Sequence, residues 1–252
     1  SVYTPAQESY SPYVAQSFPT NVYFGDTHVH TNLSVDAYLF GNKYVGPEEA
    51  YRFAKGELVL ASNGMQVRLS RPLDFLVVAD HAAYMGMLNG LEQGDIEVLQ
   101  SKDGKRYGPK LREISRAAKT DLSKAKALNM ELYRDLSAAI LDGTDSQTSN
   151  TYRQSAWKKA VLTAEKHYTP GKFSTLIGFE WSQSSVNLHR VVLFKDGADK
   201  AGSVIPFSLY DSNDPEDLWQ YMEDYQANTG GEVLAIPHSG DATMGSMFAP
   251  EN

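Results

Sequence analysis

The chain has 252 residues, of which 42% are hydrophobic, so it can bury a full core as one α/β barrel or as two smaller domains. Its formal net charge of −8 argues against nucleic-acid binding, and no apolar run approaches the roughly 20 residues of a membrane-spanning helix. Cysteine is absent, so a metal site must use histidine, carboxylate and water, which excludes zinc fingers and iron–sulfur clusters.

The lack of cysteine also bears on the compartment. Stray thiols are a liability where conditions are oxidising, so the sequence favours a periplasmic or secreted protein. Many cytosolic proteins lack cysteine too, and a cytoplasmic location is the alternative. The sequence begins at Ser1 without a methionine or a charged and then apolar leader, which is typical of a mature or trimmed product.

Short apolar runs alternate with helical segments along the chain. Residues 1–21 are rich in Ser, Pro and Tyr without periodicity, which indicates an extended surface arm. Runs typical of buried parallel strands occur at five places: Val22–Phe24, Phe75–Ala79, Thr175–Phe179, Val191–Phe194 and Val233–Ile236. Helices are predicted from Pro47, over 109–141 as two helices, over Asn150–His167 and over Asp214–Asn228. This alternation predicts a parallel α/β domain over 22–252.

The connection between the second and third predicted strands is unusually long. Its roughly 90 residues far exceed a normal crossover between parallel strands. We therefore expect a helical insertion over about residues 82–172. Because insertions at the strand-end face of a barrel commonly cap the active site, this one is expected to shape a pocket.

Five of the six histidines lie at the ends of predicted strands. His28 and His30 follow the first run, His81 ends the second, His189 precedes the fourth, and His238 follows the fifth. The carboxyl ends of parallel strands converge on one face of a barrel, which is where active sites lie. Packing alone does not account for so many histidines at strand ends, so we interpret them as candidate metal ligands.

The string GDTHVH carries the first pair of candidate ligands. Residues two apart in an extended segment point the same way, so His28 and His30 can chelate one ion. Two structural histidines near a strand end are the simpler alternative. Asp26 shares their parity and could be a ligand or orient an imidazole, and Asp36 could bind a neighbouring ion.

Charged residues near the other histidines have distinct expected roles. Glu180 ends the third strand, and a carboxylate can bridge two ions about 3.5–4 Å apart through its two oxygens. Arg190 could pair with Glu180, or it could bind the oxygens of an anionic substrate. Asp80 is expected to support His81. His167 lies inside a helical segment and is expected to be a surface or capping residue.

These clusters resemble the motifs of the polymerase-and-histidinol-phosphatase (PHP) superfamily of metal-dependent phosphoesterases. The corresponding strings are DTHVHTNLSVD, VVADH, GFEW with NLHR, and AIPHSG, and they follow the superfamily's order over residues 22–240. More narrowly, GDTHVHT, DHAAYMG, GFEW, NLHRVVLF and IPHSGD are similar to the DUF3604 branch, which is named for its unknown function. The resemblance implies an α/β fold, a distorted (β/α)7 PHP-type barrel with a helical insertion.

The resemblance also implies a cluster of two or three divalent ions. Ligand types leave Mn, Fe and Zn open. The implied ligands are His28 and His30 for a first ion, Glu180 as the bridge, His189 and His238 for a second ion, and Asp36 and His81 for a third. Asp36 lies one residue later than in the commonest superfamily spacing. The last superfamily motif, Asp-x-His, has no counterpart before Asn252. We therefore expect a second chain or a C-terminal fragment to complete the barrel.

The expected function is metal-dependent hydrolysis of an ester bond in a small anionic substrate, with a phosphate ester favoured. A hydroxide bridging two ions would attack phosphorus in line, with Glu180 and Arg190 as catalytic residues. The same site could instead hydrolyse a sulfate ester, a carboxylic ester or a lactone. Two classes without catalysis also fit the sequence. One is a binding module that is stabilised by metal. The other is a sugar-binding protein, which the 15 Tyr and three Trp suggest, although these residues are scattered along the chain. Neither a nucleic acid nor a membrane is expected as a partner.

Overall fold

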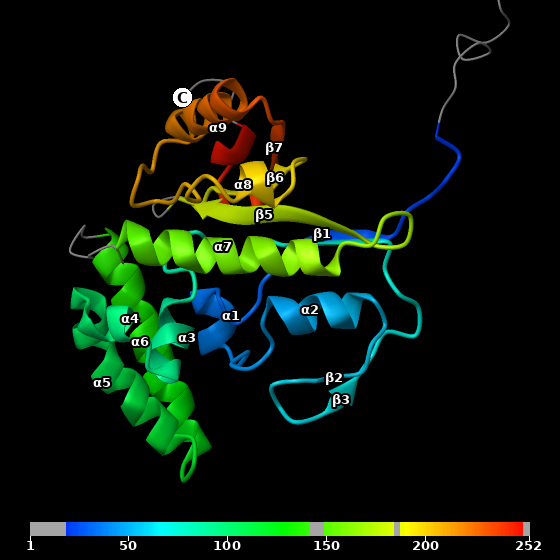
Figure 1. The fold of residues 1–252 in the computed structure, drawn as a ribbon. Helices are drawn as coiled ribbons and strands as arrows, with labels where there is room; N and C mark the ends of the chain where they lie inside the picture. The colour runs from blue at the N-terminus through cyan, green and yellow to red at the C-terminus, as the bar shows by residue number, and fades with distance from the viewer. Residues whose placement is uncertain (1–18, 142–148, 184–186, 249–252) are drawn as a thin grey trace, which may run out of the picture.

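A curled, five-stranded sheet shaped like half a barrel lies at the centre of the structure (Figure 1). The computed structural model describes residues 19–141, 149–183 and 187–248. The sheet has the order β1-β4-β5-β6-β7. Its strands are β1 (Gly25–Val29), β4 (Phe75–Val78), β5 (Ser174–Ser182), β6 (His189–Phe194) and β7 (Val233–His238).

One strand runs against the other four. β1, β4 and β5 pair in parallel, whereas β6 is antiparallel to both β5 and β7. The predicted α/β class is confirmed, but the prediction of parallel strands was wrong for β6. Only residues 183–188 connect β5 to β6, which is too short for a crossover, since a parallel connection needs about a dozen residues or more. The reversal places the beginning of β6 at the same edge of the sheet as the ends of β5 and β7.

Alternation along the strands divides the apolar side chains between two faces. Phe179 and Trp181 of β5 and Phe194 of β6 point into the main core, where Trp157 of helix α7 (Asn150–His167) packs against Phe179 and Phe194. The opposite face carries a smaller cluster of buried residues: Val77, Ala79, Val191 and Leu193. The main core therefore packs on one face of the sheet and the smaller cluster on the other, which is the face that carries Glu180.

The remaining described elements cover the sheet or lie beside it. They are α1 (Val35–Leu39), α2 (Pro47–Ala54), β2 (Val59–Leu60), β3 (Gln66–Val67), α3 (Met87–Gln93), α4 (Ile96–Gln100), α5 (Lys102–Ala117), α6 (Leu122–Leu141), α8 (Ala198–Ala201), α9 (Pro215–Thr229), and the 3-10 turns η1 (Gly240–Ala242) and η2 (Ser246–Phe248). α7 runs along the sheet, and α3–α6 gather at one end of it (Figure 1). Helices thus fill the segment predicted as an insertion.

The helix boundaries follow from their capping residues. Ser149 caps α7 by accepting a hydrogen bond from the Tyr152 N–H, and Asp214 caps α9 in the same way from the Glu216 N–H. Gly230 follows the last residue of α9 as its C-cap, and its φ of 61° is the left-handed conformation that favours glycine. The predicted helices from Pro47, over 109–141, over 150–167 and over 214–228 are present, although the first of the two helices in 109–141 already begins at Lys102.

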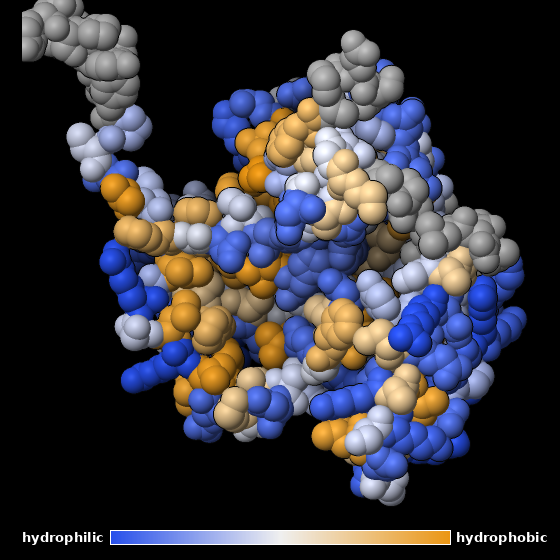
Figure 2. Space-filling view, turned by 180° about the vertical axis from the view of Figure 1, so that it is seen from behind, coloured by the Kyte–Doolittle hydropathy of each residue, from blue (hydrophilic) through white to orange (hydrophobic). Residues whose placement is uncertain are grey.

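The first predicted strand was misplaced. Val22, Tyr23 and Phe24 are 74%, 65% and 54% exposed and belong to no strand, and hydrophobic surface lies along this stretch in Figure 2. β1 begins only at Gly25, where an added Cβ would lie 2.3 Å from the Phe75 carbonyl oxygen of β4. The apolar run is therefore not buried, and the strand lies over the histidine motif itself. Of the predicted arm, residues 19–21 are exposed and the rest lies outside the described residues.

β1 and β7 form the two edges of the sheet in the part of the chain that the structure describes. A seven-stranded barrel completed by a further chain or fragment therefore stays a prediction. No helix among the described residues is both long enough and apolar enough to cross a membrane. The compartment also stays a prediction.

Candidate metal centre

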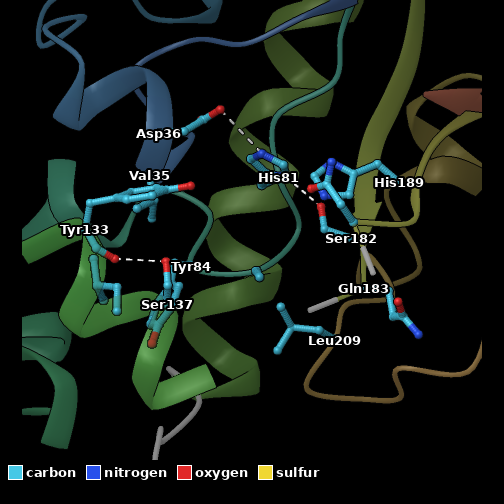
Figure 3. A pocket seen from close by; sticks show the side chains of 13 residues that line it. Val35, Asp36, His81, Tyr84, Tyr133, Ser137, Ser182, Gln183, His189 and Leu209 are labelled. Atoms are coloured by element: carbon cyan, nitrogen blue, oxygen red, sulfur yellow. Dashed lines mark hydrogen bonds and ion pairs between the residues drawn. The ribbon is translucent and has the colours of Figure 1, made fainter. Parts of the chain in front are cut away.

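The strand ends bring five histidines and two carboxylates together at one edge of the sheet. They are His28 in β1, His30 just after it, Asp36 in α1, His81 after β4, Glu180 in β5, His189 at the start of β6 and His238 at the end of β7. Ser182, His189 and His238 are direct neighbours in the ladder, and His81 forms a bridge with Glu180. Figure 3 shows Asp36, His81 and His189 beside a cavity.

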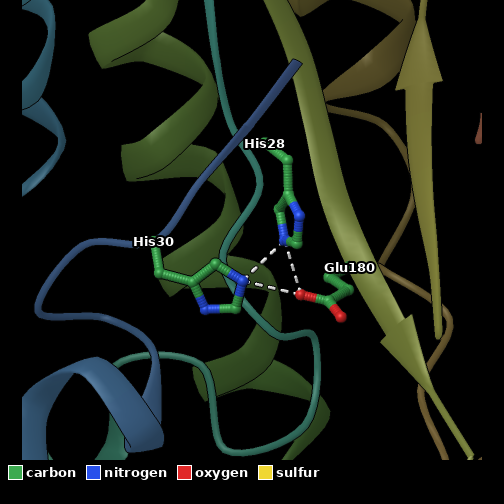
Figure 4. Close-up of side chains that lie close together, drawn as sticks. All are labelled: His28, His30 and Glu180. Carbon is green, nitrogen blue, oxygen red and sulfur yellow. Dashed lines mark hydrogen bonds and ion pairs between the residues drawn. The ribbon is translucent and has the colours of Figure 1, made fainter. Parts of the chain in front are cut away.

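Glu180 is the central residue of this cluster. Its side chain is 0% exposed, and its Oε2 lies 2.8 Å from Nε2 of His28 and 2.6 Å from Nε2 of His30 (Figure 4). Its other oxygen, Oε1, lies 2.6 Å from Nδ1 of His189 and 4.0 Å from Nε2 of His238. The two carboxylate oxygens thus face two different pairs of imidazoles, which is the arrangement that a bridging ligand requires.

Asp36 forms a second acidic centre next to Glu180. Its Oδ1 lies 3.2 Å from Nδ1 of His30, and its Oδ2 lies 3.5 Å from Nε2 of His81. The Nδ1 of His81 in turn lies 3.6 Å from Oε2 of Glu180. His30 and His81 are therefore each placed between the two carboxylates.

The donor atoms suit divalent ions. Three groups of residues place their ligand atoms within 4.8 Å of one another: His28, His30 and Glu180; His30, Asp36 and His81; and His81, Glu180 and His189. Ligand atoms that share a tetrahedral ion at about 2.0–2.2 Å lie about 3.3–3.6 Å apart, so small outward shifts would admit one. No Lys or Arg within the described ranges forms an ion pair with Glu180 or Asp36, so the cationic partners of these two carboxylates are imidazoles.

The electrostatics favour charge separation in the cluster when no ion is bound. Burial would raise the pKa of Glu180, but hydrogen bonds with His189, His28 and His30 hold it well below its usual range. Burial would lower the pKa of His30, yet its hydrogen bonds with Asp36 and Glu180 raise it to about 10. His30 therefore carries a proton that a metal ion would displace. Burial lowers the pKa of His238, which favours its neutral form.

A buried carboxylate behind the cluster fixes the loop between β1 and α1. Asp80 accepts hydrogen bonds from the Thr31 N–H at 2.6 Å, the Thr31 hydroxyl at 2.7 Å and the Ser34 hydroxyl at 2.8 Å. The Ser34 oxygen accepts a further bond from the His81 N–H at 3.0 Å. Asp80 thus supports His81 as predicted, but through Ser34. Its partners come from a distant segment, and the sequence reasoning did not mark them.

Two other residues near the histidines have roles of their own. The Ser182 Oγ lies 2.8 Å from Nδ1 of His81 and so orients this imidazole, and sequence reasoning missed it. Its signal was its spacing, because Ser182 lies two residues beyond Glu180 on the same face of β5. Asp26 accepts a hydrogen bond from the backbone N–H of His28, so it supports the backbone of β1, and its predicted role as a ligand or as an orienting group stays a prediction.

The structure does not bring Arg190 to the cluster. Arg190 follows His189 in β6, so its side chain lies on the opposite face of the strand. It is 8% exposed, contacts the sulfur of Met247, donates to the His189 carbonyl at 3.1 Å, and lies 5.8 Å from the centroid of the Trp219 ring. Arg190 therefore lies in the main core and does not pair with Glu180, and its predicted catalytic role stays a prediction that this position does not favour.

His167 also differs from its prediction. It is only 5% exposed, its Nε2 lies 2.9 Å from a carboxylate oxygen of Glu48, and its ring stacks on Tyr51 with centroids 5.5 Å apart. The end of α7 packs on α2, which buries this side chain. His167 is therefore a structural residue of the helix interface rather than a surface residue.

The fold and the cluster define a mixed α/β protein whose strand ends form a histidine–carboxylate site that can hold a metal ion. A family model described as "Protein of unknown function (DUF3604)" matches residues 17–252. The chain belongs to this family, which confirms the narrower of the two resemblances seen in the sequence. Searches of curated proteins and of solved structures found no match.

Proposed function

We propose that the protein is a metal-dependent hydrolase of the PHP superfamily that acts on ester bonds of small anionic molecules, with phosphate esters favoured. The observation that carries this proposal is the placement of Glu180. Its buried carboxylate presents one oxygen to His28 and His30 and the other to His189. Carboxylates that bridge two ions in this way are typical of hydrolytic two-metal centres.

The position of the cluster favours catalysis over a purely structural metal site. Structural sites are usually closed by protein ligands, whereas catalytic sites keep an open position. Asp36, His81 and His189 line a cavity of about 260 Å³, so ligands of the cluster border space that a substrate can enter. The same argument speaks against a binding module whose ions only stabilise the fold.

The residues of the cluster would have two roles, to bind the ions and to orient the ligands. His28, His30, Glu180 and His189 would hold the ions, and the Ser182 hydroxyl keeps the imidazole of His81 in its orientation. Bound divalent ions lower the pKa of water and neutralise charge on an anionic ester group. With no Lys or Arg among the described residues that line the cavity, the cluster is the natural place for the anionic group.

The test combines a metal panel with a substrate panel. Protein loaded with Mn, Fe or Zn is assayed against phosphate and sulfate monoesters, a carboxylic ester and a lactone. We expect the highest kcat/KM for a phosphate monoester, and loss of turnover on chelation. Glu180→Gln should lower kcat/KM at least about 100-fold, since loss of groups that only support metal ligands already costs about 10–100-fold.

The exposed Glu223 supplies the matched control, because Glu223→Gln removes a carboxylate from the surface of α9. This variant should keep wild-type turnover. Activity that survives chelation, or full activity of Glu180→Gln, would rule out the proposal. Preference for another ester in the panel would support the hydrolase assignment but would replace phosphate esters as the proposed substrates.

A further inference from the structure

The cavity beside the cluster has two chemically different walls (Figure 3). One wall consists of Asp36, His81 and His189, which are candidate metal ligands. The other is formed mainly by Tyr84 and by Tyr133 and Leu136 of α6. A substrate held at the ligands would therefore extend toward the helical segment, which shapes its binding site.

Among the described residues, the wall opposite the ligands carries no positive charge. None of the described residues that line the cavity is Lys or Arg, and Asp36 is its one carboxylate. The polar groups of the wall opposite the ligands, such as the Ser137 hydroxyl of α6, are uncharged. Burying an uncompensated anion against such a wall would cost free energy, whereas aromatic and aliphatic groups would be favoured.

The cavity is also small, and at least one residue that lines it is held in place by its backbone conformation and packing. Its volume of about 260 Å³ lies just below the range of about 300–1,000 Å³ that is common for ligand pockets. Tyr84, which lines it, has a positive φ of 58°. Non-glycine residues in this conformation cost free energy and cluster at ligand sites. Tyr84 is further fixed by edge-on packing against Tyr210 at 5.5 Å.

We infer that the substrate is a monoester of a small, uncharged alcohol with an aromatic or aliphatic body. This inference rests on the proposed function, in which the anionic group lies at the histidine cluster. The alcohol part would then lie against Tyr84, Tyr133 and Leu136. In the hydrolysis of a phosphate monoester, the oxygen of water bonds to phosphorus and the bond to the alcohol oxygen breaks. The alcohol leaves with a proton from the water, and inorganic phosphate remains.

The experiment compares two substrates with closely similar leaving groups. Phenyl phosphate has an uncharged body, and 4-carboxyphenyl phosphate adds one negative charge at its far end. With metal-loaded protein we expect kcat/KM to favour phenyl phosphate at least about tenfold. Ser137→Arg places a cation on the far wall and should remove most of this preference. Ala138→Arg adds the same charge on the exposed neighbouring position of α6 and should retain it.

Binding of the two corresponding phosphonates, measured by calorimetry, separates the inference from the hydrolase proposal. If neither ester is hydrolysed but phenylphosphonate binds at least about tenfold more tightly than its 4-carboxy derivative, the preference of the cavity for an uncharged body stands, whereas hydrolysis of phosphate monoesters fails. Equal hydrolysis of both esters, equal binding of both phosphonates, or failure of both to bind would overturn the inference. Should Ser137→Arg not fold, the wild-type ratio decides.

Discussion

The Nδ1 atom of His189 lies 2.6 Å from Oε1 of Glu180, although the two residues belong to strands that run in opposite directions. The ladder pairs Ser182 with His189, so the start of β6 lies beside the end of β5. This reversal supplies the second side of the cluster. Without it, Glu180 would keep its contacts with His28 and His30 but lose His189.

The two carboxylate oxygens of Glu180 face different histidines. We therefore expect that removing one of these histidines releases only the ion on its own side. His28→Ala removes a ligand of one side, and His189→Ala removes a ligand of the other. Each variant should bind about one ion fewer than the wild type while it keeps its fold, as measured by elemental analysis and circular dichroism. His167→Ala is the matched control, since it should lower Tm but leave the metal content unchanged. Equal metal content in all three variants would refute the assignment of sides.

The raised pKa of His30 predicts that metal binding releases protons. In the metal-free protein the pKa of His30 is raised to about 10, so its imidazole is protonated at pH 7. A metal ion must displace that proton, and metal affinity should therefore rise with pH. Calorimetry at pH 7 in two buffers of different ionisation enthalpy should reveal this release. Identical heats in both buffers would contradict the assignment.

The shifted pKa values of His30 and Glu180 predict how the stability of the metal-free protein depends on pH. The His30 contribution is complete below its unfolded pKa of about 6.5 and is lost as pH rises through about 10. The lowered pKa of Glu180 gives a contribution that is present above about 4.5 and is lost as pH falls. The Tm difference between wild type and His30→Gln should therefore be largest between about pH 4.5 and 6.5. A difference that grows from pH 7 to 10 would disprove this.

Asp80 should matter for both stability and metal binding. Asp80→Asn weakens the bonds to Thr31 and Ser34, so we expect a loss of about 1–3 kcal/mol in the free energy of unfolding. Metal affinity should fall about 10–100-fold, because Ser34 holds the backbone of His81. Urea unfolding and metal titration measure these effects. The exposed Asp224→Asn on α9 is the control and should change neither quantity.

Arg153 should stabilise the protein without affecting the metal centre. Its guanidinium is 7% exposed and donates to Asp211 at 2.6 Å, to the Pro206 carbonyl at 2.9 Å and to the Ser208 hydroxyl at 3.1 Å. Lysine cannot reproduce this fork, so Arg153→Lys should cost about 2–3 kcal/mol of unfolding free energy at unchanged metal content. Unchanged urea unfolding would show that the bonds contribute little.

Much of the site could be predicted because its residues form recognisable local patterns in the sequence. Histidines at the ends of apolar runs, and an acid at the end of another, are strong signals when strand ends converge. The structure places these histidines around Glu180. The alternation of β6 also predicts that Arg190 lies on the face opposite His189, since neighbours in a strand point to opposite faces.

Other features lacked a local signal. Thr31 and Ser34 contact Asp80 across 46 to 49 residues of sequence, and the cavity wall from α6 depends on how that helix packs. The apolar run at Val22–Phe24 resembles a buried strand but is exposed, because hydrophobicity alone does not show what covers a segment. The direction of β6 was predictable in principle from the short connection to β5.

The most direct test of the central claim is anomalous diffraction from crystals grown with Mn or Zn. We expect at least two ions, one on the His28 and His30 side of Glu180 and one on the His189 side, about 3.5–4 Å apart, with a carboxylate oxygen bound to each. An ion pattern that leaves Glu180 without a metal contact, or crystals without ions at this cluster, would contradict the account.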